Sequence, residues 1–164
     1  MRAIPLAVLL TLMIPFAAIA QPSTTPGYTA FDQQQFAKLG ADVGTWNCTD
    51  APASKAPDVV TVTQQGNWFV YRETGDDPNT TYQRWSHDRR MYVSLRISDS
   101  GDMGIITTAS LDPDNATWNI VFPPGVPKNQ NVTFSKSGNT LNVTFPYPDS
   151  KGNMMTGKSV CAKV

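Results

Sequence analysis

The side chains that could do chemistry are few in this sequence of 164 residues. His87 is its single histidine, and Glu73 is its single glutamate. His87 stands in Ser86-His87-Asp88-Arg89, where two strands are expected to meet, so we expect a turn histidine that points to solvent. No Gly-x-Ser-x-Gly motif occurs in the chain. A Ser–His–Asp arrangement therefore has little to build on, and the sequence predicts no catalytic residues.

Acidic residues gather in three short segments that could supply oxygen ligands to calcium. The segments are Asp76-Asp77, Asp99 to Asp102 and Asp112 to Asn115. None has the twelve-residue spacing with a closing glutamate that defines a calcium loop. Aspartate and asparagine are also common turn residues, because their side chains bond to nearby backbone. We interpret these segments as turns and predict no metal and no cofactor.

Two arginines in adjacent expected strands, Arg84 and Arg96, could hold a ligand carboxylate if either pointed inward. Arg96 shares a strand face with Tyr92 and Ser94, which is the more polar face of that strand. We therefore expect Arg96 to point outward into solvent.

The two cysteines, Cys48 and Cys161, lie near opposite ends of the part of the chain that follows residue 20. Residues 1–20 have the pattern of a signal peptide: Arg2, an apolar stretch, and a small-x-small cleavage site at Ala18-Ile19-Ala20. Export places the chain in an oxidising compartment, where a Cys48–Cys161 disulfide is expected. Two free thiols are the alternative.

Removal of the signal would leave a mature chain from about Gln21, secreted or periplasmic, with one fewer basic than acidic residues. A charge this balanced argues against nucleic acid and against an anionic membrane surface as partners. The only long apolar run is the signal itself, so we expect no stable membrane insertion, and we expect a monomer. The domain boundaries are 1–20 for the signal, 21–31 for a flexible lead-in and 32–164 for one folded domain.

The elements that must position these side chains are almost all strands. Asp32 is the expected N-cap of a short helix from Gln33 to about Leu39, and a period of two begins after it. Turn residues separate runs rich in β-branched and aromatic residues. These runs are Thr45–Thr49, Val59–Gln65, Trp68–Thr74, Thr81–Ser86, Met91–Ser98, Met103–Ser110, Thr117–Phe122, Asn131–Ser135, Thr140–Pro146 and Gly157–Lys163.

Short connections favour antiparallel pairing of neighbouring strands, and a sheet of this size tends to close. The fold class predicted is all-β: an up-and-down antiparallel β-barrel of about 8–10 strands with a short N-terminal helix. A two-sheet β-sandwich is the alternative. Alternation of apolar and polar residues assigns apolar side chains to the barrel interior, where they would line a lumen. These candidates are Trp46, Met91, Val93, Leu95, Ile97, Trp118, Ile120, Phe122, Leu141, Val143 and Phe145.

Gly44-Thr45-Trp46 opens the first expected strand directly after the helix. A helix, a Gly-x-Trp strand and a long antiparallel meander resemble the calycin superfamily of lipocalins and fatty-acid-binding proteins. The stretch Leu39 to Thr49 is also similar to uncharacterised secreted bacterial proteins of lipocalin-like kind. The resemblance implies that Trp46 packs inside one end of the barrel and that a last-strand lysine, Lys158 or Lys163, covers its ring.

Ten short strands also resemble the nitrobindin-like barrels, which hold haem through a histidine. The only histidine here is expected in a turn, so haem binding is not predicted. The first functional hypothesis is a non-catalytic barrel that binds a small apolar ligand in its lumen. The alternative is an envelope or stress-related structural barrel with a filled core and no ligand. A small-barrel enzyme that uses an interior Tyr, Arg or Asp is the third hypothesis.

Overall fold

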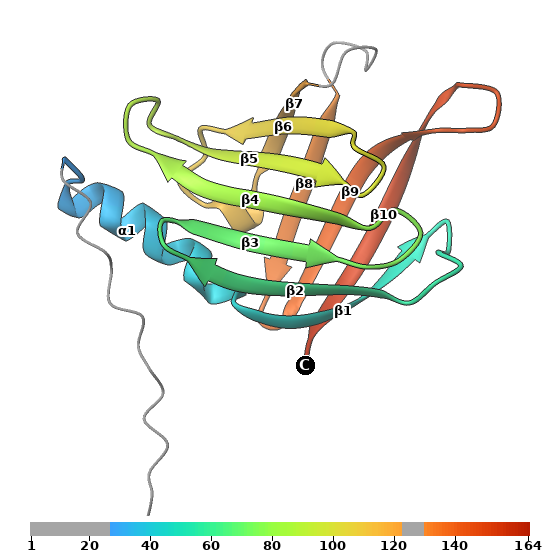
Figure 1. The fold of residues 1–164 in the computed structure, drawn as a ribbon, viewed down its shortest axis with the longest axis horizontal. Helices are drawn as coiled ribbons and strands as arrows, with labels where there is room; N and C mark the ends of the chain where they lie inside the picture. The colour runs from blue at the N-terminus through green and yellow to red at the C-terminus, as the bar shows by residue number, and fades with distance from the viewer. Residues whose placement is uncertain (1–26, 123–129) are drawn as a thin grey trace, which may run out of the picture.

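The computed structural model describes residues 27–122 and 130–164, so the expected signal peptide lies outside the described residues. Ten antiparallel strands form a closed barrel (Figure 1). The strands are β1 (Gly44–Ala51), β2 (Asp58–Gln65), β3 (Trp68–Glu73), β4 (Asn79–Ser86), β5 (Met91–Ser98), β6 (Met103–Thr108), β7 (Thr117–Phe122), β8 (Asn131–Ser137), β9 (Thr140–Pro148) and β10 (Met154–Lys163).

Each strand pairs with its neighbours in sequence, and β1 closes the barrel by pairing with β10. This up-and-down order follows from the short turns, which leave each strand nowhere to pair except beside the one before it. Closure satisfies the backbone groups that edge strands would otherwise expose. The barrel prediction is confirmed, and the sandwich alternative is excluded.

The Cys48–Cys161 disulfide is confirmed and lies at the closing seam. The two residues are directly opposite each other in the β1–β10 register, with Cα atoms 4.0 Å apart. The bond joins residues 113 apart in sequence and therefore removes much of the conformational freedom of the unfolded chain. A disulfide of this kind indicates an oxidising compartment.

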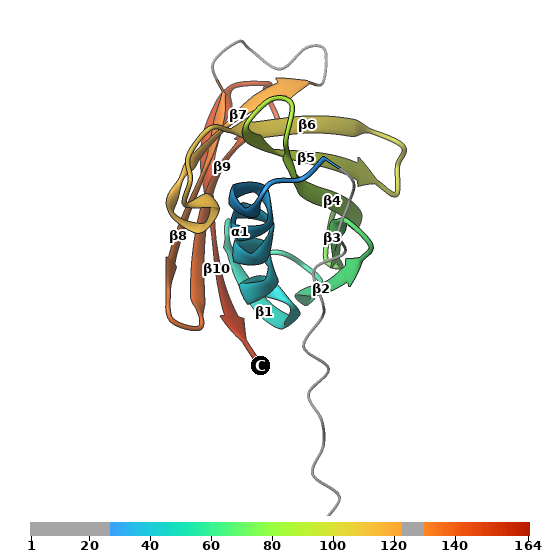
Figure 2. The ribbon, with the colours of Figure 1, turned by 90° about the vertical axis from the view of Figure 1, so that its left-hand side faces the viewer.

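The N-terminal helix α1 (Ala30–Leu39) lies across one end of the barrel, which we call the helix end (Figure 2). Its start differs from the sequence expectation, because Thr29 is the N-cap and Asp32 is the third helical residue. Thr29 and Asp32 form a reciprocal capping box, so the aspartate marks the third helical residue and not the N-cap. The helix continues into a short 3-10 turn, η1 (Gly40–Asp42). No helix among the described residues is long and apolar enough to cross a membrane.

The interior at the helix end is filled by large side chains. Trp85, Tyr92 and Trp118 are completely or almost completely buried and pack in tilted or edge-to-face pairs with ring centroids 5.0 and 6.2 Å apart. Phe36 from α1 adds a ring that lies 4.9 Å from the ring of Phe69. The helix therefore closes this end of the barrel with apolar contacts, which also give a short helix the tertiary support that it requires.

Two glycines in the barrel allow large side chains to lie directly over the backbone. A Cβ on Gly44, whose φ is +138°, would lie 2.8 Å from Cε of Lys163. A Cβ on Gly157 would lie 2.6 Å from the ring of Phe145, its cross-strand partner. The glycine of Gly44-Thr45-Trp46 is thus required by the path of Lys163, and Gly157 gives a flat surface for an aromatic ring.

Strand β5 presents to the interior the face that its sequence pattern assigns to solvent. Tyr92, Ser94 and Ser98 are buried, and the Tyr92 hydroxyl donates to the backbone oxygen of Gln35 in α1 at 3.0 Å. Successive strand residues point to opposite faces, so the alternate set faces outward. That set is the apolar one expected to line the lumen: Met91, Val93, Leu95 and Ile97.

This difference has a physical cause in the neighbouring strands. Inward-facing Trp85 and Tyr92 are directly opposite in the β4–β5 register, and their indole and phenol groups find partners inside the barrel. The outward side chains of β5 are only partly exposed, because residues such as Tyr82 and Ile105 flank Leu95 on the outer face. An outer face can therefore be as apolar as an inner one, and alternation alone does not distinguish them.

Candidate functional site

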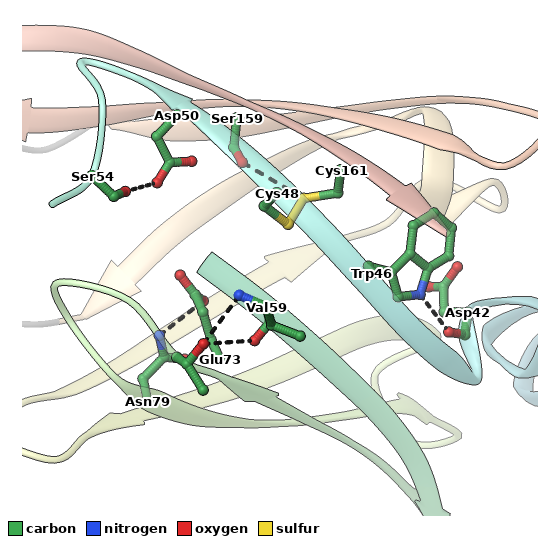
Figure 3. Close-up of a disulfide and its surroundings, with 11 residues drawn as sticks. Asp42, Trp46, Cys48, Asp50, Ser54, Val59, Glu73, Asn79, Ser159 and Cys161 are labelled. Carbon is green, nitrogen blue, oxygen red and sulfur yellow. Dashed lines mark hydrogen bonds between the residues drawn. A yellow bond between two sulfur atoms is a disulfide. The ribbon is translucent and has the colours of Figure 1, made fainter. Parts of the chain in front are cut away.

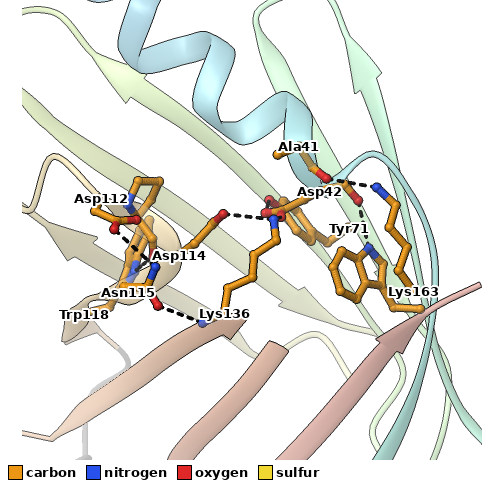
Figure 4. Close-up of polar contacts among 11 residues, drawn as sticks. Ala41, Asp42, Tyr71, Asp112, Asp114, Asn115, Trp118, Lys136 and Lys163 are labelled. Carbon is orange, nitrogen blue, oxygen red and sulfur yellow. Dashed lines mark hydrogen bonds and ion pairs between the residues drawn. The ribbon is translucent and has the colours of Figure 1, made fainter. Parts of the chain in front are cut away.

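The Trp46 indole at the helix end is held by a backbone acceptor and by two lysines (Figure 4 shows the surrounding residues). It is 3% exposed, and its Nε1 donates to the backbone oxygen of Asp42 at 2.8 Å. Nζ of Lys163 lies 5.4 Å from the ring centroid and also donates to the backbone oxygen of Ala41 at 2.9 Å. The covering lysine is thus Lys163 and not Lys158, which is paired with Ala51 towards the other end of β1.

Lys136 is a second cation over Trp46, 5.5 Å from its ring centroid, and the sequence analysis missed it. Its Nζ donates to Asp42 at 2.5 Å and to Asp114 at 2.9 Å. The Tyr71 hydroxyl donates to the second oxygen of Asp42 at 2.9 Å. The signal for Lys136 was its phase, because it lies two residues after Phe134 in β8 and shares its inward face.

These groups, which we call the helix-end network, are a satisfied ion-pair cluster. Burial and the negative charge of Asp42 raise the pKa of Tyr71 well above its usual range. Burial tends to lower the pKa of Lys136, but its bonds to Asp42 and Asp114 outweigh this and raise it. Lys136 stays charged and Tyr71 stays a hydroxyl donor, so the network holds η1 and β8 together.

A cavity of about 30 Å³ lies beside this network. Its lining includes Asp42, Tyr71, Gln83, Pro113, Asp114, Trp118, Phe134 and Leu141. Ligand pockets usually enclose about 300–1,000 Å³, whereas this volume suits a water molecule or two. The cavity is therefore too small to hold a ligand of that class.

His87 is in a turn as expected, but its ring is not simply solvated. The side chain is 43% exposed, and Nδ1 lies 2.8 Å from Oδ2 of Asp32. The Trp85 indole donates to the other oxygen of Asp32 at 2.6 Å. Burial tends to raise the pKa of Asp32, but hydrogen bonds from Thr29, Trp85 and His87 outweigh it and hold the pKa below its usual value. This group anchors α1 to the β4–β5 turn.

Three carboxyl groups lie on the inner face towards the other end of the barrel, which we call the open end. We name Asp50, Asp58 and Glu73 the carboxyl cluster; they come from β1, β2 and β3. Figure 3 shows Asp50 and Glu73 with the nearby disulfide. Asp58 is opposite Cys48 in the β1–β2 register, and Glu73 is opposite Val60 in the β2–β3 register, one inner-face position along from Asp58.

The cluster contains a buried acceptor that no described residue satisfies. Asp58 is 8% exposed, and its Oδ1 accepts no hydrogen bond among the described residues. Asp50 accepts from the Ser54 hydroxyl, and Glu73 Oε2 accepts from the Asn79 amide at 2.8 Å. A buried acceptor without a donor costs free energy. In this respect Asp58 at the open end differs from the helix-end network, whose polar groups are hydrogen-bonded.

Two carboxyls of the cluster, Asp58 and Glu73, have raised pKa values. Burial, followed by the charges of Glu73 and Asp50, raises the pKa of Asp58 to about 7. Burial also raises the pKa of Glu73, although the Asn79 amide and the Arg96 charge oppose this. Perturbed carboxyls that face a barrel interior are typical of functional sites.

The loops at the open end hold the cluster in place. The Asp76 carboxylate accepts from the backbone N–H groups of Lys55 and Ala56 at 2.8 and 3.0 Å, which joins the β1–β2 and β3–β4 loops. The Thr74 hydroxyl donates to the backbone oxygen of Pro57 at 3.2 Å, directly before Asp58. Asp76 is therefore a turn and loop residue, as the sequence analysis expected.

Arg96 differs from the sequence expectation, because it shares the inward phase of Tyr92 and Ser94. Its guanidinium binds the carboxylate of Asp77 at 2.6 Å, and both side chains are exposed. The positive charge of Arg96 also acts on Glu73, where it tends to lower the pKa. The polar face of β5 is an inner face, so its arginine belongs to the open end of the lumen.

Apolar side chains of β8 and β9 form the opposite part of this interior. Phe134, Leu141, Val143 and Phe145, which we call the apolar wall, share the inward phase of their strands and are partly exposed. Of the other lumen candidates, Trp118 is buried in the helix-end core, Ile120 is partly exposed, and the side chain of Phe122 lies outside the described residues.

Among the residues that the structure describes, no three His, Cys, Asp or Glu side chains are placed to hold a metal ion. Comparison with protein-family models and with curated proteins finds no match for this chain. The carboxyl cluster was missed in the sequence analysis, although its signal was present: Asp58 shares a strand face with Val60 and Val62, and Glu73 shares one with Phe69 and Tyr71.

Proposed function

We propose that this protein is a binding barrel of calycin type, exported and monomeric, that takes a small molecule with an apolar part through its open end. The observation that carries the proposal is the uneven filling of the interior. At the helix end, inward side chains such as Trp85 and Tyr92 are fully buried, whereas the inward Val143 and Phe145 of the apolar wall are partly exposed. Inward apolar side chains that still contact solvent are a surface that a ligand would cover.

The competing hypothesis is a structural barrel whose core is filled and binds nothing. It accounts well for the helix end, where aromatic rings and the helix-end network leave a cavity of only about 30 Å³. It does not account for the partly exposed apolar wall, or for the buried Oδ1 of Asp58, which accepts no hydrogen bond from the described residues.

The direct test is titration of purified, delipidated protein with N-phenyl-1-naphthylamine, a neutral apolar fluorophore. We expect saturable one-to-one binding with a rise in fluorescence. Val143→Trp, which places an indole in the apolar wall, should weaken binding strongly. Asn142→Trp is the matched control, because Asn142 is the adjacent residue of β9 and lies exposed on the outer face. Absence of saturable binding by the unmodified protein would leave the filled structural barrel as the better account.

A further inference from the structure

We propose that the carboxyl cluster of Asp50, Asp58 and Glu73 binds the protonated amino group of the ligand, so that the barrel selects amphipathic amines. This inference rests on the proposed function, because it names the chemical class of the molecule that enters the open end. The cluster would hold the cationic group while the apolar wall contacts the hydrocarbon part.

The first argument is the unsatisfied acceptor. Oδ1 of Asp58 is buried and accepts no hydrogen bond from any described residue, and Asp58 as a whole is only 8% exposed. An ammonium group carries three N–H donors and no acceptor, which suits a site made of carboxyl oxygens. Charge-assisted N–H···O bonds to such a group would satisfy Asp58 and add a strong, directional contact.

The second argument is the arrangement of charge around the site. Within residues 27–122 and 130–164, the charged groups that act on the cluster are the three carboxyls themselves together with Asp77 and Arg96. Four of these five groups are acidic, and Arg96 is already paired with Asp77. Among the described residues, no positive charge balances the three carboxyls, and a cationic ligand would supply that charge.

The third argument is the distance between the cluster and the apolar wall. Along one inner-face row Asp50 is opposite Ser159, and Ser159 is opposite Val143. Along the next, Asp58 is opposite Cys48, Cys48 opposite Cys161, and Cys161 opposite Leu141. Neighbouring strands are about 4.8 Å apart, so Val143 lies roughly 10 Å from Asp50 across the sheet. A molecule with one amino group and a chain of several carbons would span that distance.

The test compares octylamine, 1-octanol and octanoate by isothermal titration calorimetry at about pH 8, where octylamine is protonated. The three probes share one hydrocarbon chain and differ in the charge of the head group. We expect octylamine to bind at least about tenfold more tightly than 1-octanol, and octanoate to bind most weakly. The preference for the amine should shrink at about pH 5, where protons compete with the amine for Asp58.

Two variants test whether the carboxyl cluster causes the preference for the amine over the alcohol. Asp58→Asn and Glu73→Gln should each lower the amine-to-alcohol preference to within about twofold, with 1-octanol binding retained. Asp88→Asn is the matched control, because it removes one exposed carboxyl at the helix end and should keep the preference. A preference that persists in both cluster variants would overturn the inference.

The comparison of probes on the unmodified protein separates the two proposals without relying on any variant to fold. If 1-octanol binds and octylamine binds no more tightly, the amine site is wrong and the binding barrel stands. If none of the three probes binds, and the neutral fluorophore also fails, the binding function itself is wrong. If octylamine alone binds, with the preference lost in Asp58→Asn, the carboxyl cluster is the dominant site.

Discussion

Replacement of Asp58 by Asn should stabilise the protein at alkaline pH, which is unusual for a change to a buried residue. The pKa of about 7 in the folded state compares with an ordinary value of 3.8. The folded chain therefore binds the Asp58 proton more tightly than the unfolded chain, and the folded state loses stability as pH rises from about 4 to about 7. The cause is the cost of ionising a carboxyl that is buried and faces Glu73 and Asp50.

The magnitude follows from the size of the pKa difference. At 1.36 kcal/mol for each pKa unit, the ionised Asp58 costs at most about 4 kcal/mol of unfolding free energy. Water at the open end of the barrel screens part of this, so we expect about 2 kcal/mol. Asp58→Asn cannot ionise, and it should therefore unfold at a higher urea concentration than the unmodified protein at about pH 8, with a much smaller difference at about pH 4.5.

The assay is equilibrium urea unfolding followed by tryptophan fluorescence at both pH values, with the disulfide kept intact. Asp88→Asn is again the control for loss of one negative charge from the whole protein. It should change the free energy of unfolding at pH 8 by less than Asp58→Asn does. The reasoning would be refuted if Asp58→Asn lowered the free energy of unfolding, and lowered it by the same amount at pH 8 and at pH 4.5. That result would mean that folding does not raise the pKa of Asp58, and that other contacts stabilise its ionised carboxylate in the folded state.

Two further changes probe the helix end. Trp46→Ala should lower the free energy of unfolding, measured in urea, by about 3–5 kcal/mol. The change empties a buried indole site and removes the ring that Lys163 and Lys136 contact. A near-neutral change would reject the packing role of this ring. Asp32→Asn should cost about 2 kcal/mol at pH 7, since charge-assisted bonds are lost. Its low folded pKa means that this contribution is present above the unfolded pKa and fades as pH falls, so thermal unfolding of the two proteins should converge in acid.

The strand pattern was predictable because it depends on local chemistry. All ten strand regions were identified from β-branched and aromatic runs separated by turn residues such as Gly66 and Gly138, both of which have a positive φ. The up-and-down strand order was predictable because short connections favour antiparallel neighbours, and closure was predictable because a sheet of about ten strands tends to close. The disulfide followed from compartment and position, because the terminal strands of a closed sheet must meet.

The face of each strand was less predictable, and β5 shows why. Its alternation is clear, but both faces are packed: Tyr92 and Ser94 inside, and Leu95 beside Tyr82 outside. Which face turns inward depends on the register with β4 and on the hydroxyl and indole partners that α1 supplies. Those partners, such as the backbone oxygen of Gln35, are distant in sequence and become neighbours only in the folded barrel.

The sequence by itself determined the ten strands, the short helix, the cysteine pairing and the tryptophan of the first strand, because each depends on residue type and spacing along the chain. Only the tertiary structure decided which side chains share the interior of the barrel. Asp58 and Glu73 are 15 residues apart, and β1 brings Asp50 beside them. Burial raises the pKa of Asp58 and of Glu73, and the nearby charge of Asp50 adds to both shifts; these causes depend on distance in space. A carboxyl in a strand is ordinary in sequence; its lack of a hydrogen-bond donor exists only once the strands have closed around it.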